Sequence, residues 1–165
     1  MAELAKTPGA SKLRELILDD SQVTDEGIKG LPWMPNLNVF SASKTQVTDA
    51  GVAHLNKIGN ISTLRLDRVR VTDTGLQSIG QMKSLRALSL WRCLVTDQGL
   101  THLKDLTNLE TLSLDETGVT AAGVKQLVPK LPGLRYLSVW KTKVRSNDVA
   151  ELKQLNSNLK VNIGQ

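Results

Sequence analysis

Apolar residues recur along the chain in two alternating spacings, and these spacings predict the secondary structure. In the stretch 84–106 the first three leucines form the pattern L-x-x-L-x-L, which places Leu88 and Leu90 on one face of a strand. The last three leucines of the stretch, from Leu100 to Leu106, lie three residues apart, which places them along one side of a short helix. The stretch therefore predicts a strand, a turn and a helix.

The same arrangement recurs through the chain with a period of 24 or 25 residues. The turn is marked by Val-Thr-Asp or a variant of it, which begins at Val23, Val47, Val71, Val95, Val119 and Val144. The leading apolar position of the strand gives the same period, at Leu13, Leu37, Ile61, Leu85, Leu109, Leu134 and Leu159. The two columns predict six strand–turn–helix copies and a closing strand within residues 158–163. Because one copy cannot bury its own apolar side, we expect the copies to stack into a parallel sheet, with strands about 4.8 Å apart.

Polar residues mark the expected start of each helix. Threonine stands where an N-cap belongs, at Thr24, Thr48, Thr72, Thr96 and Thr120. An aspartate follows the first four of these threonines and would favour the positive end of the helix, at Asp25, Asp49, Asp73 and Asp97. This column of carboxylates could also attract a cation, but its regular recurrence at helix starts favours capping.

These motifs carry a resemblance to a known family. The pattern L-x-x-L-x-L followed by a shorter apolar anchor resembles the leucine-rich repeat family over about residues 11–163. The period and the turn Val-Thr-Asp-x-Gly-Leu resemble its cysteine-containing subclass, which is known from F-box ubiquitin-ligase substrate receptors and from bacterial arrays. The column that often holds Cys or Asn in the eukaryotic form holds Ser, Thr or Val here, apart from Cys93, so the bacterial type is the closer match. The resemblance implies an α/β solenoid, a horseshoe with parallel strands on its concave face and short helices on its convex face.

We expect two segments along the 165 residues. Residues 1–12 are interpreted as a short N-terminal cap or linker, in which residues 2–6 could form a helical turn, and residues 13–165 as the leucine-rich repeat domain. Lys160 in the closing strand would discourage further edge pairing. The first repeat has little to cover it, so self-association through the N-terminal edge is an open alternative.

Composition and charge narrow the class of protein. Aromatic residues make up only 3 % of the chain, so the core must be aliphatic. The formal charge of +5 is moderate, and nucleic acid is therefore a less favoured partner than protein. The single Cys93 lies in an inward column, which predicts a buried thiol. With neither a signal-peptide pattern nor an apolar run of membrane-span length in the sequence, we expect a cytoplasmic protein with no membrane partner.

The strand side chains that point away from the core are the candidates for binding. Trp91 and Trp140 share one outward column two repeats apart, about 10 Å by strand spacing, and Tyr136 lies on the same face. Exposed aromatic residues flanked by charges have the composition of protein-binding hot spots, although each Trp could instead pack on its neighbour. The predicted partner-binding residues are Trp91, Trp140, Tyr136, Arg65, Arg92, Lys141, Asp67 and Asp115.

Two further groups were assigned from the pattern. Arg65, Arg68 and Arg70 form a basic cluster on the third repeat. They could form a cross-strand charge ladder or contact a ligand, and the facing carboxylates are those of Asp19, Asp20 and Asp67. Trp33, between two prolines, is predicted to be a local packing plug at a helix end.

Catalytic readings have little support in the sequence. His54 and His102 occupy one helix column two repeats apart, too far to share a metal. The sequence contains no nucleophile motif, P-loop or dinucleotide fingerprint. We therefore expect no enzymatic activity, no metal and no cofactor. The favoured function is a non-catalytic protein–protein interaction module that binds a protein or peptide on its concave face. The alternative is a structural or adaptor segment of a larger repeat protein, such as a ubiquitin-ligase-like substrate receptor.

Overall fold

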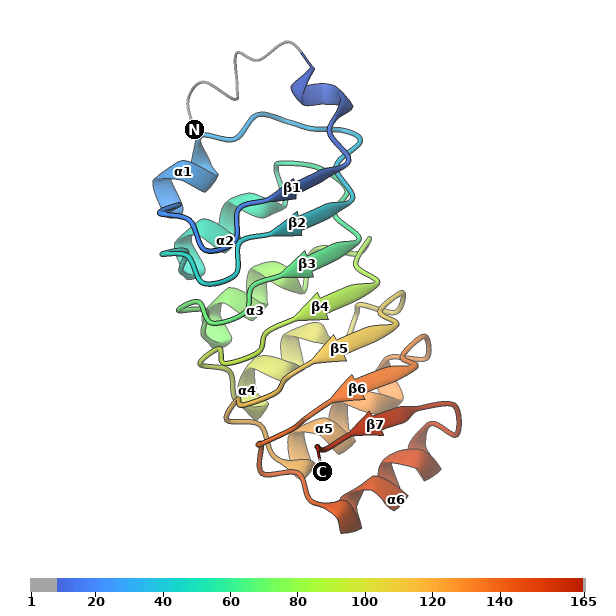
Figure 1. Cartoon of the computed structure of the whole chain (residues 1–165). Coiled ribbons are helices and arrows are strands. Elements are labelled where there is room, and N and C mark those ends of the chain that lie inside the picture. The colour runs from blue at the N-terminus through green and yellow to red at the C-terminus, as the bar shows by residue number, and fades with distance from the viewer. Residues whose placement is uncertain (1–8, 165) are drawn as a thin grey trace.

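The computed structural model describes residues 9–164, which form one parallel sheet with helices along one side (Figure 1). The strands lie in chain order and are β1 (Glu15–Ile17), β2 (Val39–Ser41), β3 (Thr63–Arg65), β4 (Ala87–Ser89), β5 (Thr111–Ser113), β6 (Tyr136–Ser138) and β7 (Lys160–Asn162). The α-helices are α1 (Asp25–Lys29), α2 (Asp49–Leu55), α3 (Asp73–Ile79), α4 (Asp97–Leu100), α5 (Ala121–Leu127) and α6 (Ser146–Leu155). Short 3-10 helices are η2 (Ala10–Lys12), η3 (Thr101–Leu103) and η4 (Val128–Lys130). The open, uncurled sheet and its one layer of helices confirm the predicted stack of strand–turn–helix copies with a closing strand.

The strand register places each residue beside its equivalent in the next repeat. Leu64 pairs with Leu88, and Leu88 with Leu112, so that one buried column runs through the sheet. A second inward column, which includes Leu66 and Leu90, is equally buried. The predicted aliphatic core is thus confirmed as a set of parallel columns, which no single repeat could bury alone.

Threonine caps the helices as the pattern predicts. The hydroxyl of Thr72 accepts a hydrogen bond from the backbone N–H of Thr74 at 3.2 Å, and this satisfies one of the free donors at the start of α3. The same side-chain cap occurs at Thr48, Thr96 and Thr120. Thr24 has the extended backbone of an N-cap but makes no such side-chain bond.

The aspartate after each of the first four capping threonines links two repeats. The carboxylate of Asp49 accepts from the backbone N–H of Thr72 at 2.8 Å and from its hydroxyl at 2.6 Å. The equivalent pairs are Asp25–Thr48, Asp73–Thr96 and Asp97–Thr120. Within residues 9–164 no three His, Cys, Asp or Glu side chains are grouped as a metal ion would require. The column therefore serves mainly to join neighbouring repeats, in addition to its place at the helix starts.

A glycine leaves space for each linking carboxylate. A Cβ atom on Gly75 would lie 2.4 Å from Oδ1 of Asp49, too close for any real contact. The equivalent glycines, with carboxylate oxygens at 2.3 or 2.4 Å from the same position, are Gly51, Gly99 and Gly123. The turn sequence Val-Thr-Asp-x-Gly is thus one inter-repeat contact: the Asp of one copy fits against the Thr and the Gly of the next.

The junction between the fifth and sixth repeats is built differently. Ala121, Arg145 and Asp148 occupy the columns that hold Asp, Thr and Gly in the earlier copies. Here the ammonium of Lys125 lies 2.9 Å from Asp148 and 2.7 Å from Glu151, and so an ion-pair network replaces the Asp–Thr link. The hydrogen bonds from Glu151 and Asp148 raise the pKa of Lys125, and the bond from Lys125 lowers the pKa of Asp148. All three columns changed together because they form one contact.

The first repeat is less well covered than the rest. Leu13, Leu18 and Val23 are half-buried, whereas the equivalent residues of the second repeat, Leu37, Ala42 and Val47, have no exposed surface. η2 lies within the segment interpreted as a cap or linker, and Asn36 donates to the backbone carbonyl of Ser11 at 2.8 Å. The helical turn expected at residues 2–6 lies outside the described residues.

The prediction for Trp33 was wrong. Its side chain is 55 % exposed, because the next residue, Met34, is the one that enters the core and has no exposed surface. The N–H of Met34 donates to the carbonyl of Ile58 at 2.5 Å, which holds this turn against the following repeat. Trp33 is consequently left on the surface and makes no contribution to the core.

Candidate functional site

The predicted binding residues lie on the side of the sheet that faces away from the helices, here called the open face (Figure 1). Trp91 and Trp140 follow β4 and β6 in equivalent positions. The residue after this column adopts a left-handed backbone in every repeat, with φ between 52° and 59°, at Asp20, Lys44, Arg68, Arg92, Glu116 and Lys141. All six are charged and none is glycine, so a row of charges borders the tryptophan column.

Trp91 is held in one orientation by charged neighbours. Its indole Nε1 donates to Oε1 of Glu116 at 3.3 Å. The guanidinium carbons of Arg68 and Arg92 lie 5.7 and 5.5 Å from the ring centroid, within the range of cation–π attraction. The ring itself is only half-buried. Trp91 is therefore a fixed aromatic surface that remains accessible.

Glu116 connects three of the predicted residues. It accepts from Nε of Arg92 at 2.7 Å and lies 3.7 Å from the ammonium of Lys141, in addition to its bond with Trp91. The hydrogen bond from Arg92 is the main cause that holds the pKa of Glu116 below its ordinary value. The sequence interpretation did not include Glu116 in the site, although an acid between two bases in one column was visible in the pattern.

Trp140 differs from Trp91 in its surroundings. The ammonium of Lys141 lies 4.2 Å from its ring centroid. The backbone of Gly164 packs so closely on the indole that a Cβ there would be 1.7 Å from Cδ1 of Trp140. Gly164 therefore covers part of Trp140, whereas Trp91 is flanked by charged side chains that lie at the surface.

The carboxylates of Asp67 and Asp115 are bound within the sheet. Oδ1 of Asp67 accepts from the hydroxyl of Ser89 and from the backbone N–H of Trp91, the latter at 3.0 Å. The same pair of bonds joins Asp19 to Ser41 and Ser43, and Asp115 to Ser138 and Trp140. These carboxylates position the start of the turn that carries each tryptophan, a role that the sequence pattern did not indicate.

The predicted charge ladder between the arginines of the third repeat and the facing aspartates was wrong. Asp20 pairs instead with Lys44 at 3.1 Å, and Asp19 and Asp67 accept from serine hydroxyls and backbone N–H groups. Within residues 9–164, no carboxylate lies within 4.0 Å of a nitrogen of the basic cluster Arg65, Arg68 and Arg70. All three side chains are exposed.

Tyr136 lies apart from the tryptophans along its strand. It is 39 % exposed at the start of β6, whereas Trp140 lies beyond the end of that strand. Tyr136 lines an open cleft of about 700 Å³ together with Arg135, Asn156 and Lys160. The structure thus brings together Trp91, Arg92 and Lys141, but places Tyr136 in a separate part of the face.

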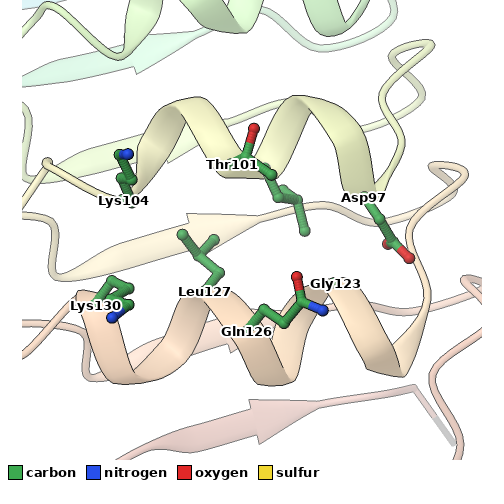
Figure 2. A pocket seen from close by; sticks show the side chains of 8 residues that line it. Asp97, Thr101, Lys104, Gly123, Gln126, Leu127 and Lys130 are labelled. Carbon is green, nitrogen blue, oxygen red and sulfur yellow. The ribbon is translucent and has the colours of Figure 1, made fainter.

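The helix side offers less to a ligand. Figure 2 shows a cavity of about 320 Å³ between the helices of the fourth and fifth repeats, bordered by Lys104 and Lys130 at one end and Asp97 at the other. Its apolar floor includes Leu127, which is only 5 % exposed, and the carboxylate of Asp97 is already bound to Thr120. The cavity therefore has little free apolar or acidic surface.

Cys93 is buried, as predicted. It is 3 % exposed, and its thiol donates to the carbonyl of Leu66 at 3.0 Å. Burial raises the pKa of the thiol to about 12, so almost none of it is the reactive thiolate near neutral pH. No helix in the described part of the chain has both the length and the apolar character needed to cross a bilayer.

The stacked strand–turn–helix units, the parallel sheet and the aliphatic columns together define a leucine-rich repeat solenoid. A family model described as "Leucine Rich repeat" matches residues 9–31, the first repeat. The comparison with curated proteins gave no match. The cysteine-containing subclass and its bacterial form remain predictions.

Solved structures support the same fold. An internalin from Listeria monocytogenes is 17 % identical, with a TM-score of 0.61 over 94 % of this chain and 48 % of that one. A leucine-rich repeat protein of Leptospira interrogans is 18 % identical, with a TM-score of 0.67 over 93 % and 38 %. Internalin C2 of Listeria monocytogenes is 20 % identical, with a TM-score of 0.56 over 94 % and 82 %. The chain therefore spans about half or less of the first two structures.

Proposed function

We propose that the chain is a non-catalytic module that binds a protein or peptide on its open face. The leucine-rich repeat fold is generally one of protein–protein interaction, which supports the class of function. The observation that carries the proposal for this chain is Trp91, a large aromatic side chain at a strand end where the preceding and following repeats have aspartate. The fold does not require an indole at this position, because Asp67 and Asp115 occupy it without disturbing the sheet.

The surroundings of Trp91 suit binding. Aromatic and arginine side chains are enriched where interfaces gain most of their free energy, and a side chain already fixed in position loses little entropy on binding. Glu116 and Arg92 provide this fixation, and Lys141 extends the charged border towards Trp140. Asp67 and Asp115 contribute indirectly, since they position the backbone of the two tryptophans.

The proposal is tested with the double variant Trp91→Ala/Trp140→Ala and the matched control Trp33→Ala. Trp33 is an exposed indole outside the open face, so its loss removes the same chemistry from another surface. A partner captured by the wild type is identified, purified and titrated against all three proteins. We expect the control to bind as the wild type does and the double variant to bind at least about tenfold more weakly. Equal affinity of the folded double variant would reject the open face as the binding site.

A second candidate is an adaptor or structural segment that stacks through its first repeat. It is favoured by Leu13, Leu18 and Val23, which are only half-buried in the described structure. Such a segment could belong to a larger repeat protein, of which a ubiquitin-ligase-like substrate receptor is one version, and a cytoplasmic location would suit it. Sedimentation equilibrium over a wide concentration range distinguishes the version based on self-association: a constant monomer mass at all concentrations would exclude it.

A further inference from the structure

The arginines of the third repeat carry charge that the described structure does not neutralise. The other bases beside the tryptophan column have acidic partners, since Lys44 pairs with Asp20 and Arg92 with Glu116. Arg68 lies between them in the same column, and its contact is with the ring of Trp91. Arg65 and Arg70 flank it in sequence, and all three side chains are exposed.

The nearest carboxylate in sequence, that of Asp67, faces away from this role. Its Oδ1 is bound to the hydroxyl of Ser89 and the N–H of Trp91, both in the fourth repeat. Glu116, the next acid along the border column, is occupied by Arg92. The open face of the third repeat therefore presents three guanidinium groups together, and these attract an external anion.

Apolar surface lies directly beside this charge. Leu94 is 64 % exposed and follows Arg70 by one repeat in the same outward column. Trp91 is half-buried and lies within cation–π range of Arg68. The strand positions around them hold the small residues Ala87 and Ser89, which leave room for a chain to approach. Arginines on one repeat thus border a tryptophan and a leucine on the next.

We propose that this surface binds an acidic peptide segment that carries a large apolar side chain. Its carboxylates contact Arg65, Arg68 and Arg70, whose planar forks match the geometry of a carboxylate. Its apolar side chain packs on Trp91 and Leu94. This inference rests on the proposed function and goes further, because it names the chemistry of the partner and moves the main charged contacts to residues of the third repeat.

The test uses synthetic peptides of defined composition as probes. A fluorescent peptide of about twelve residues, built from Glu with two central Leu, is titrated by anisotropy at low and at physiological salt. Two companion peptides replace every Glu by Gln or both Leu by Ser. We expect saturable binding of the Glu/Leu peptide and at least about tenfold weaker binding of both companions. Equal binding of the Gln peptide, or no saturation by about millimolar concentration, would overturn the proposal.

Two triple variants separate the site from the overall charge. Arg65→Gln/Arg68→Gln/Arg70→Gln removes the cluster, and Lys57→Gln/Lys104→Gln/Lys153→Gln removes the same charge from exposed residues of the helix side. The first should weaken binding of the Glu/Leu peptide about tenfold or more, and the second less than about twofold. Equal weakening by both would show non-specific attraction and reject the site. Circular dichroism and thermal unfolding confirm that each variant is folded.

Two further arms identify other outcomes. Tighter binding of a single-stranded oligonucleotide than of the Glu/Leu peptide, lost in the arginine variant, would replace the proposal with a nucleic-acid site. If a protein partner needs Trp91 and Trp140 but binds the arginine variant as tightly as the wild type, the proposed function stands and the acidic-segment inference fails. Leu94→Ser should weaken binding of the Glu/Leu peptide and leave that of the Ser companion unchanged.

Discussion

The carboxylate of Asp49 accepts hydrogen bonds from both the backbone N–H and the hydroxyl of Thr72, a residue 23 positions further along the chain. The Thr72 hydroxyl in turn accepts from the N–H of Thr74. A continuous chain of hydrogen bonds thus runs from the start of α2 to the start of α3. The repeats are therefore joined at their turns by specific polar contacts as well as by the aliphatic core.

Removal of one such carboxylate should destabilise the fold measurably. In Asp49→Ala the N–H and hydroxyl of Thr72 lose a charged acceptor in a partly buried site, and we expect a loss of about 1–3 kcal/mol in the free energy of unfolding. Urea denaturation monitored by circular dichroism measures this loss. Asp105→Ala is the control, because Asp105 is exposed and its ion pair with Lys83 is 3.9 Å long. A similar loss in both variants would contradict a specific role for the link.

Gly75 and Asp49 should show strong energetic coupling. Gly75→Ala introduces a Cβ that would lie 2.4 Å from the Asp49 carboxylate, so it should destabilise the protein although alanine is the better helix former. In the Asp49→Ala background the carboxylate is absent, and the cost of Gly75→Ala should be clearly smaller. A double-mutant cycle by urea denaturation measures the difference. Additive costs would show that the glycine serves another purpose.

The last helix should respond to salt and acid in a way that the earlier helices do not. Lys125 joins α5 to α6 through Asp148 and Glu151, and salt screens such exposed ion pairs. Hydrogen exchange of α6 should therefore accelerate with added salt, while that of α3, held by Asp49 and Thr72, should change less.

Acid should act on the same junction through Asp148. Its pKa is lowered in the folded state, so the stabilisation that it provides is present above the ordinary aspartate range and is lost as the pH falls through the lowered value. The salt and acid responses of α6 should both diminish in Lys125→Gln. Undiminished responses in that variant would assign them to other groups.

Cys93 should make stability fall in alkaline solution. Burial raises the pKa of its thiol from 9.0 to about 12, so between these values the unfolded state releases a proton that the folded state retains. The resulting stabilisation of the folded state is complete below about pH 9 and is lost as the pH rises toward 12. Unfolding free energies of the wild type and Cys93→Ala, compared across this range, isolate the effect from other titrating groups. Parallel pH profiles of the two proteins would contradict it.

The columns of the fold could be predicted from the sequence because each depends on one residue type at a fixed period. Leu88, Leu90 and Thr96 occupy the predicted places, since the spacing alone determines which side of a strand or helix a residue occupies. The prediction for Trp33 failed because it and Met34 are adjacent large apolar residues at a turn, where no periodicity decides which one enters the core.

The contacts between repeats were harder to predict, because they depend on pairs of columns. Asp19, Asp20 and Asp67 are close in sequence to turns that carry arginines, yet backbone N–H groups and serine hydroxyls reach Asp19 and Asp67 first. The same limitation hid Glu116, whose importance depends on Arg92 and Lys141 in the neighbouring copies. Charge complementarity between successive copies is the signal that would have revealed it.

The aspartates at positions 19, 67 and 115 lie in alternate copies, 48 residues apart, and each binds a serine of the copy that follows. The structural unit at this edge is consequently a pair of unlike copies, an odd one that donates the carboxylate and an even one that receives it. Shortening or lengthening the protein by one copy would place two odd or two even copies side by side, without the matching partner. Insertion or removal of a whole pair would keep the phase, so the chain can be engineered in steps of two copies but not of one.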